Sequence, residues 1–241
     1  MYLPSVTTVL SATETAKSKA SLKNWQEKNP GALEAASARG SAIHLGCEQH
    51  LRGLPVDIPE EYQGFWHGMS QYLDWFDTIH WSERPLRPDW YHLRSDDKEV
   101  SYVWSTVHKY AGCPDLIGEI GGVKVIADFK TSNGPYMNSF PDRGDRMGFG
   151  GFRKFQKCAQ QMAAYRLALE ERTGFRCDVA LVIASTEETT QAIFIDGDQL
   201  SLYESRFLKR AEQFHSIEAD NADQGCSEQE LLQQDEAAGD S

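Results

Sequence analysis

Two aspartates and a lysine, Asp115, Asp128 and Lys130, are the side chains of this chain best suited to do chemistry. They flank two apolar runs joined by Gly121-Gly122, a dipeptide favoured in two-residue β-hairpin turns. With that turn, Asp115 faces Asp128, and Lys130 projects from the same face. Facing residues lie roughly 5 Å apart, so two carboxylates repel each other unless a divalent cation lies between them. The pattern predicts a metal site beside a lysine that orients a water or stabilises negative charge.

The other residues of the hairpin support this register. Glu119 would face Lys124 as an opposite charge, and Ile117 would face Ile126. The second face is apolar throughout and is expected to pack on the core. Its residues are Leu116, Gly118, Ile120, Val123, Val125, Ala127 and Phe129.

The elements that must position the hairpin predict an α/β domain, with a central mixed β-sheet flanked by helices. Helices are expected over residues 13–28, 33–52, 60–78, 155–173 and 198–216, and strands over 99–110, 177–185 and 191–195. Residues 81–90 are expected to be irregular or an edge strand, and residues 132–154 to be a long Gly-rich loop. Residues 1–215 are predicted as one domain, with a helical N-terminal part over 1–80.

Composition bounds the class of protein. A chain of 241 residues with 40% hydrophobic content can bury the core of one ordinary domain. No apolar run approaches 18 residues, so no membrane span is expected, and residues 1–10 lack the pattern of a signal peptide. The five scattered cysteines indicate free thiols in a reducing compartment. These features favour a cytoplasmic protein of bacterial or phage origin.

The residues around the aspartates match a known signature. Pro114-Asp115 followed by Asp128-Phe129-Lys130 fits the PD-(D/E)xK pattern. A histidine on an earlier helix, His44, and the pair Gln161 and Tyr165 on a later helix extend the match over roughly residues 33–185. The chain therefore resembles the PD-(D/E)xK nuclease superfamily, in its RecB-like branch. Segments 3–7, 39–44, 110–112 and 128–132 give a closer similarity to the mitochondrial genome maintenance exonuclease group and its phage or bacterial relatives.

This resemblance implies a restriction-endonuclease-like core, placed at about 33–53 and 95–195. It implies metal ligation by His44, Asp115, Asp128 and the backbone carbonyl of Phe129, with Mg²⁺ or Mn²⁺ as the ion. Asp115, Asp128 and Lys130 would be catalytic. Some branches carry an iron–sulfur cluster on grouped cysteines; the cysteines here are not grouped, so no cluster is expected.

Several of these residues also have plainer interpretations. A lone helical histidine such as His44 is more often structural, and Lys130 could simply pair with Asp128. Glu48, one turn after His44, is expected to be a supporting or alternative ligand. Glu99 is either a solvated strand end or an acidic group near the metal. Gln161 and Tyr165 share a helix face, either as an ordinary polar edge or, as the resemblance implies, as support for the site and contacts to the DNA backbone.

Basic residues follow the hairpin. Phenylalanines are interleaved with Arg143, Arg146, Arg153 and Lys154, a composition suited to phosphate contacts and base stacking along a single strand. The alternative is a poorly ordered insertion. The formal net charge of −12 is concentrated at the C-terminus, because residues 216–241 hold eight acidic residues and no Lys or Arg. That tail is predicted to be disordered or loosely helical, as a solubilising end or as a DNA mimic that covers a basic groove.

The function expected from these features is a metal-dependent DNA exonuclease that prefers single strands or free ends. A structure-specific endonuclease or nickase on the same fold is the first alternative. A non-catalytic DNA-binding relative is the second, and the intact Asp115, Asp128 and Lys130 set argues against it. DNA is the expected partner, and no membrane is involved.

Overall fold

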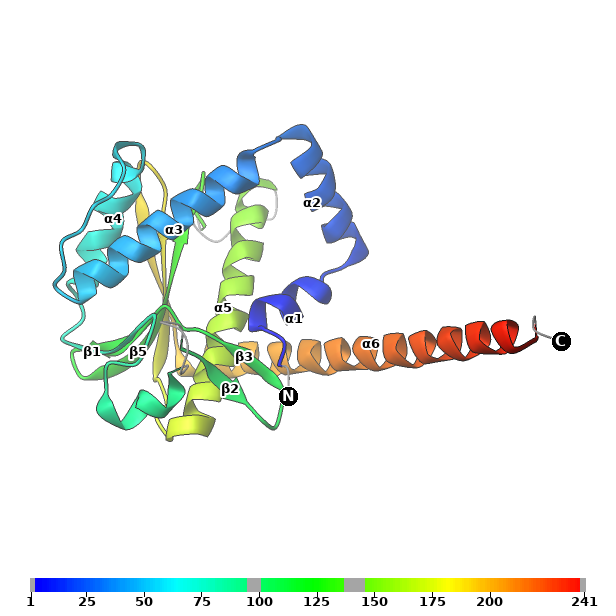
Figure 1. The fold of residues 1–241 in the computed structure, drawn as a ribbon. Coiled ribbons are helices and arrows are strands. Elements are labelled where there is room, and N and C mark those ends of the chain that lie inside the picture. The colour runs from blue at the N-terminus through cyan, green and yellow to red at the C-terminus, as the bar shows by residue number, and fades with distance from the viewer. Residues whose placement is uncertain (1–2, 95–100, 137–145, 239–241) are drawn as a thin grey trace.

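The predicted hairpin is present and lies inside a larger sheet. The computed structural model describes residues 3–94, 101–136 and 146–238, and over 146–149 and 222–238 it describes the backbone alone. A five-stranded mixed sheet lies between two layers of helices (Figure 1), which confirms the predicted α/β class. Its strands are β1 (Thr78–Ser82), β4 (Leu116–Ile120), β5 (Val123–Thr131), β6 (Val179–Ser185) and β7 (Thr190–Ile195), in the order β1-β4-β5-β6-β7.

The turn between β4 and β5 has the conformation that the sequence predicts. Gly121 and Gly122 have φ values of +59° and +79°, the left-handed values that a type I′ hairpin turn needs at both central positions. Glu119 is paired with Lys124, and the pairing continues in register to Leu116 and Ala127. The predicted register is therefore confirmed, and Asp115 precedes the last pair by one residue.

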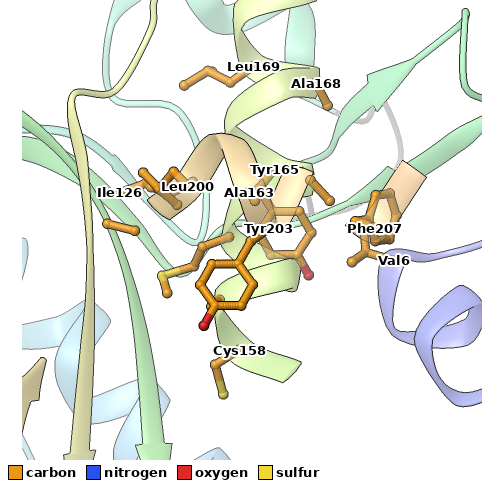
Figure 2. Packing of buried hydrophobic residues seen from close by; sticks show 14 of the residues in the cluster. Val6, Ile126, Cys158, Ala163, Tyr165, Ala168, Leu169, Leu200, Tyr203 and Phe207 are labelled. Atoms are coloured by element: carbon orange, nitrogen blue, oxygen red, sulfur yellow. The ribbon is translucent and has the colours of Figure 1, made fainter. Parts of the chain in front are cut away.

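Helices cover both faces of the hairpin. On one face, α3 (Ala32–Leu51) and α4 (Gln63–Leu73) pack against Leu116 and Phe129. On the other face, α1 (Val6–Ala12), α5 (Arg146–Thr173) and α6 (Gly197–Ala238) form the larger core. Figure 2 shows Tyr165 and Ala163 of α5 packed near Leu200 and Phe207 of α6. The face that carries Asp115, Asp128 and Lys130 is consequently covered as well, and Ile117 and Ile126 are fully buried there.

Helix α5 connects β5 to its parallel neighbour β6, as a parallel pair requires. Its C-terminus is as predicted, because Gly174 takes a φ of +71° and donates its N–H to Glu170. Its N-terminus is not: residues 146–154, predicted as loop, are helical. The glycines suggested a break, but Gly151 serves packing, since a Cβ there would lie 2.0 Å from the carbonyl oxygen of Tyr136.

Other segments differ from the prediction where pairing is long-range. The helix predicted over 60–78 consists of a short 3₁₀ turn, η1 (Glu60–Tyr62), and α4, and residues 78–82 pair with β4 as the edge strand β1. The single strand predicted over 99–110 is two short strands, β2 (Val103–Ser105) and β3 (Tyr110–Gly112), which form a separate small sheet. Lys109, with a φ of +54°, closes the turn between them.

Two further helices complete the described part of the chain. They are α2 (Ala16–Lys28), which Thr15 caps, and the 3₁₀ helix η2 (Pro88–Leu93). Helix α6 continues to Ala238 through the acidic segment for which the sequence left disorder or loose helix open. That segment contains no proline and is rich in Ala, Glu and Gln, which favour helix. None of the helices in the described ranges has the length and apolar character needed to cross a membrane.

Glu171, near the end of α5, ties the turn of the small sheet to the domain. Its Oε1 accepts the N–H of Thr106 at 2.9 Å and the Thr106 hydroxyl at 2.7 Å. Burial raises the pKa of Glu171, but hydrogen bonds from Ser105 and Thr106 and the charge of Arg172 outweigh it and lower this pKa to about 2. The ionised carboxylate therefore stabilises the folded state.

We expect Glu171→Gln to lower the free energy of unfolding at pH 7 by about 1 kcal/mol, the size of a charge-assisted hydrogen bond at a partly exposed site. Because the folded pKa is depressed, this contribution is present above the unfolded pKa of about 4.5 and is lost as pH falls toward 2. Urea unfolding at pH 7, 5 and 3.5 measures the difference. Glu212→Gln, an exposed site on α6, is the control. A difference in the free energy of unfolding between Glu171→Gln and the unaltered protein that stays the same from pH 7 to pH 3.5 would contradict this role.

Candidate metal centre

Asp115 is held from both neighbouring strands of the sheet. Its backbone carbonyl accepts the N–H of Glu83, beyond the end of β1, at 2.9 Å. Its Oδ2 accepts the N–H of Phe129, in β5, at 2.8 Å. The side chain is nearly buried, with 8% of the residue exposed. The carboxylate thus has a fixed direction, which is what a metal ligand requires.

His44 projects from α3 toward the same point. Its Nε2 lies 3.0 Å from the carbonyl oxygen of Phe129, and its Nδ1 lies 3.3 Å from Glu83 Oε1 and 3.7 Å from Asp115 Oδ2. Burial lowers the pKa of His44, but the negative charges of Asp115 and Glu83 outweigh it and raise this pKa to about 9. Without a cation, the ring carries a proton that a metal ion would have to replace.

Glu83 is a functional candidate that the sequence did not reveal. His44, Glu83 and Asp115 each offer one ligand atom, and these three atoms lie within 4.8 Å of one another, close enough to share a cation. The position follows from the pairing of Ser82 with Leu116, which places the next residues, Glu83 and Asp115, side by side. Glu83 takes a left-handed φ of +56°, which is unusual for a non-glycine residue. Glu83 could have been placed at the centre only if residues 78–82 had been assigned as a strand that pairs with β4.

Asp128 and Lys130 form the second half of the site, on β5. The ammonium Nζ of Lys130 lies 2.7 Å from both carboxylate oxygens of Asp128. The bond to Oδ1 has hydrogen-bond geometry, whereas the buried Oδ2 is held by charge alone and accepts no hydrogen bond from the described residues. Asp128 is 1% exposed. Among the described residues the ammonium is thus the partner of both oxygens, and a carboxylate held in this way can also coordinate a cation.

The charges of this pair are coupled. Burial raises the pKa of Asp128 to about 6, Lys130 opposes that rise, and the charge of Asp115 adds to it. Burial lowers the pKa of Lys130, but Asp128 and Asp115 outweigh it and hold this pKa well above the usual value. Lys130 is therefore an ammonium at neutral pH. That state suits positioning of a water and stabilisation of negative charge rather than general-base action.

The donor set fits a hard divalent cation. Three carboxylates, one imidazole and one backbone carbonyl give the mixed oxygen and nitrogen ligation suited to Mg²⁺ or Mn²⁺. The structure brings His44, Asp115 and the Phe129 carbonyl together as predicted, and adds Glu83. Asp128 is turned toward Lys130 and lies outside the group of clustered donor atoms.

Gln161 and Tyr165 lie behind this centre on α5. Gln161 donates a hydrogen bond of 3.0 Å to the Tyr165 hydroxyl, so the two predicted supporting residues do share a face. Tyr165 is buried, and its pKa is raised by burial first and then by the nearby charges of Asp115 and Asp128. Its ring packs on Gly112, where a Cβ would lie 2.2 Å from the ring.

The other predicted residues lie farther from the centre or outside the described part of the chain. Glu48 lines the same cleft as His44 but binds Arg52 at 2.7 Å and lies 3.7 Å from Arg84. Exposed Arg153 contacts the hydroxyl of Ser18 on α2, and exposed Lys154 donates to Ser132 Oγ at 3.1 Å. Arg146 begins α5, where the backbone alone is described, and Glu99 and Arg143 lie outside the described residues.

The centre opens into a cleft of about 530 Å³ between α3 and the end of β1. The cleft is lined by Gly40, Ser41, His44, Leu45, Glu48, Glu83 and Cys113. A ligand in this cleft would therefore reach His44 and Glu83 directly. Searches of protein-family models and of curated proteins find no match to the chain.

Proposed function

We propose that this protein is a metal-dependent DNA exonuclease with a restriction-endonuclease-like core, acting on single strands or free ends. The observation that carries the proposal is the convergence of His44, Glu83 and Asp115 beside the buried Asp128–Lys130 pair, at the mouth of a cleft. Three clustered metal-ligating groups, with a carboxylate–ammonium pair next to them on β5, suit phosphodiester hydrolysis, which needs an activated water and a stabilised anionic transition state.

The residues of the centre have two tasks in this mechanism. His44, Glu83, Asp115, Asp128 and the Phe129 carbonyl would hold Mg²⁺ or Mn²⁺. A bound ion supplies Lewis-acid activation of a water and positive charge for the transition state. The Lys130 ammonium, fixed 2.7 Å from Asp128, orients the water or neutralises charge on the phosphate.

Nearby basic residues support nucleic acid as the substrate. Exposed Arg153 and Lys154 lie on α5, the helix that follows the strand of Lys130. Arg153 contacts α2, a helix with no buried residue that carries Lys17, Lys19, Lys23 and Lys28. Cations along one side of the site would hold the phosphates of a strand.

We expect the protein, in Mg²⁺ or Mn²⁺, to degrade a linear single-stranded oligonucleotide and to leave a closed circular single strand of the same sequence intact. The reason is that an exonuclease needs an end. Gel analysis over a time course measures both substrates, and EDTA should stop the reaction. Rapid cleavage of the circular strand would show that the protein is an endonuclease and would overturn the exonuclease proposal. Absence of cleavage of both substrates, or full activity in EDTA, would overturn it.

A further inference from the structure

A second cleft, of about 470 Å³, is lined by residues of the small sheet and of the N-terminal segment. Figure 1 shows β2 and β3 beside the N-terminal end of the chain. The cleft is lined by Leu3, Ser5, Thr8, Tyr102, Trp104, Ala111 and Gly112. We call it the β2–β3 groove. The N-terminal segment forms one wall, because Pro4 accepts the N–H of Ala111 at 3.0 Å. The groove has a defined backbone on two sides.

Two aromatic side chains of the groove point to the same side. Tyr102 and Trp104 are two residues apart in extended backbone, and Val103 between them is fully buried on the opposite side. Tyr102 is 45% exposed, although its backbone N–H is fixed by Leu93 at 3.2 Å. Trp104 is half-buried beneath the guanidinium of Arg172, 5.5 Å from its ring. Two rings are thus presented to a groove in which none of the described lining residues is charged.

The β2–β3 groove and the cleft of the candidate metal centre are lined by neighbouring residues of the chain. Gly112 lines the groove, and its Cα packs on the ring of Tyr165, whose hydroxyl is bonded to Gln161 behind the centre. Cys113, which lines the metal-site cleft, follows Gly112 directly, and Asp115 comes two residues later. A single strand lying across residues 112–115 would place one base over the small sheet and a neighbouring phosphate at the metal.

We infer that the β2–β3 groove binds one unpaired nucleobase of single-stranded DNA, next to the phosphate that is cleaved. The inference rests on the proposed function. Aromatic rings offer a stacking surface that every base can use, and the lack of charge in the lining suits a base rather than a phosphate. The hydroxyl of Thr8 lies at the wall, and beside its 2.7 Å bond to the Ser5 hydroxyl that caps α1 it keeps capacity to bond to the polar edge of a base. A paired duplex base could not enter without leaving its stack.

The test is binding of fluorescent oligonucleotides to the Lys130→Ala protein, which keeps the substrate intact. We expect Tyr102→Leu to weaken single-strand binding by about tenfold, as loss of one base-stacking ring does, and Tyr102→Phe to stay within about twofold. Tyr91→Leu is the matched control, because Tyr91 is 44% exposed but lies outside the groove lining. Binding of Tyr102→Leu equal to that of its parent, with circular dichroism showing a folded protein, would overturn the inference.

A second measurement removes the base instead of the ring. An abasic site is moved along the oligonucleotide, and one position is expected at which it weakens binding to the parent but not to Tyr102→Leu. Equal losses for both proteins at every position would contradict stacking on Tyr102. The last measurement uses a Tyr102→Leu protein that keeps Lys130. If this protein degrades linear DNA with an unchanged KM, the groove inference fails and the proposed function stands. If the unaltered protein neither binds nor cleaves DNA, the proposed function fails.

Discussion

Replacing Lys130 with alanine is expected to lower the single-turnover rate of DNA cleavage by about 10³-fold, the loss typical of one preorganised charge-stabilising group. This factor corresponds to about 4 kcal/mol of transition-state stabilisation. The ammonium lies 2.7 Å from Asp128 and keeps its proton at neutral pH, so the variant loses a positive charge at the reacting phosphate. Quenched-flow or time-course assays at saturating Mg²⁺ measure the rate.

The fold should survive this change. Lys130 opposes the rise in the pKa of Asp128, so its removal moves that pKa further above 6 and lets the buried carboxyl take up a proton. A neutral Asp128 avoids the cost of an unpaired buried charge. Thermal unfolding should therefore remain cooperative, and single-strand binding should remain measurable. Lys209→Ala, at an exposed position on α6, is the matched control. Full activity of Lys130→Ala would exclude the lysine from the mechanism.

The second large effect concerns the ion itself. We expect Mn²⁺ at about 100 times its dissociation constant to stabilise the unaltered protein by about 2.7 kcal/mol, which raises Tm by roughly 5–10 °C for a chain of this size. Asp115→Asn should remove both this shift and the cleavage activity. The amide oxygen can still accept the N–H of Phe129, so the backbone clamp is kept while the negative charge is lost.

Differential scanning fluorimetry with and without Mn²⁺ measures this shift, and EDTA should reverse it. Asp57→Asn removes one carboxylate at an exposed loop position and is expected to shift as the unaltered protein does. A full Mn²⁺ shift in Asp115→Asn, or none in the unaltered protein, would mean that this cluster does not bind the ion.

The features that the sequence predicted are those set by local rules. The β4–β5 register follows from two glycines that can take positive φ, and the facing positions then follow from the alternation of the strand. The shared face of Gln161 and Tyr165 follows from helical spacing. These rules placed Asp115 opposite Asp128 with Lys130 beside them, whereas His44 and the Phe129 carbonyl became candidates only through the resemblance stated for the sequence.

The features that the sequence missed depend on distant pairing. Glu83 joins the centre because β1 pairs with β4, and no short pattern around Glu83 signals that pairing. Helix α5 begins at Arg146 rather than at residue 155, and Gly151 within it fits against the backbone of Tyr136. A local propensity scale rates such a glycine as a helix break, because it does not include that contact. The burial of Asp128 follows from α5 packing over the face of the hairpin that carries Asp115, Asp128 and Lys130, which the strand alternation alone does not reveal.

The position of β5 in the sheet also determines when the centre can exist during folding. On one side β5 pairs with β4 through a two-residue turn, a contact that closes early because it is local. On the other side it pairs in parallel with β6, and His44 and Glu83 arrive from α3 and β1, all at long sequence separation. A chain that has formed only the hairpin holds Asp128 and Lys130 but lacks the imidazole and the glutamate. On the proposed function, ion binding would therefore report that the long-range pairing is complete, and a chain with the hairpin alone would be inactive.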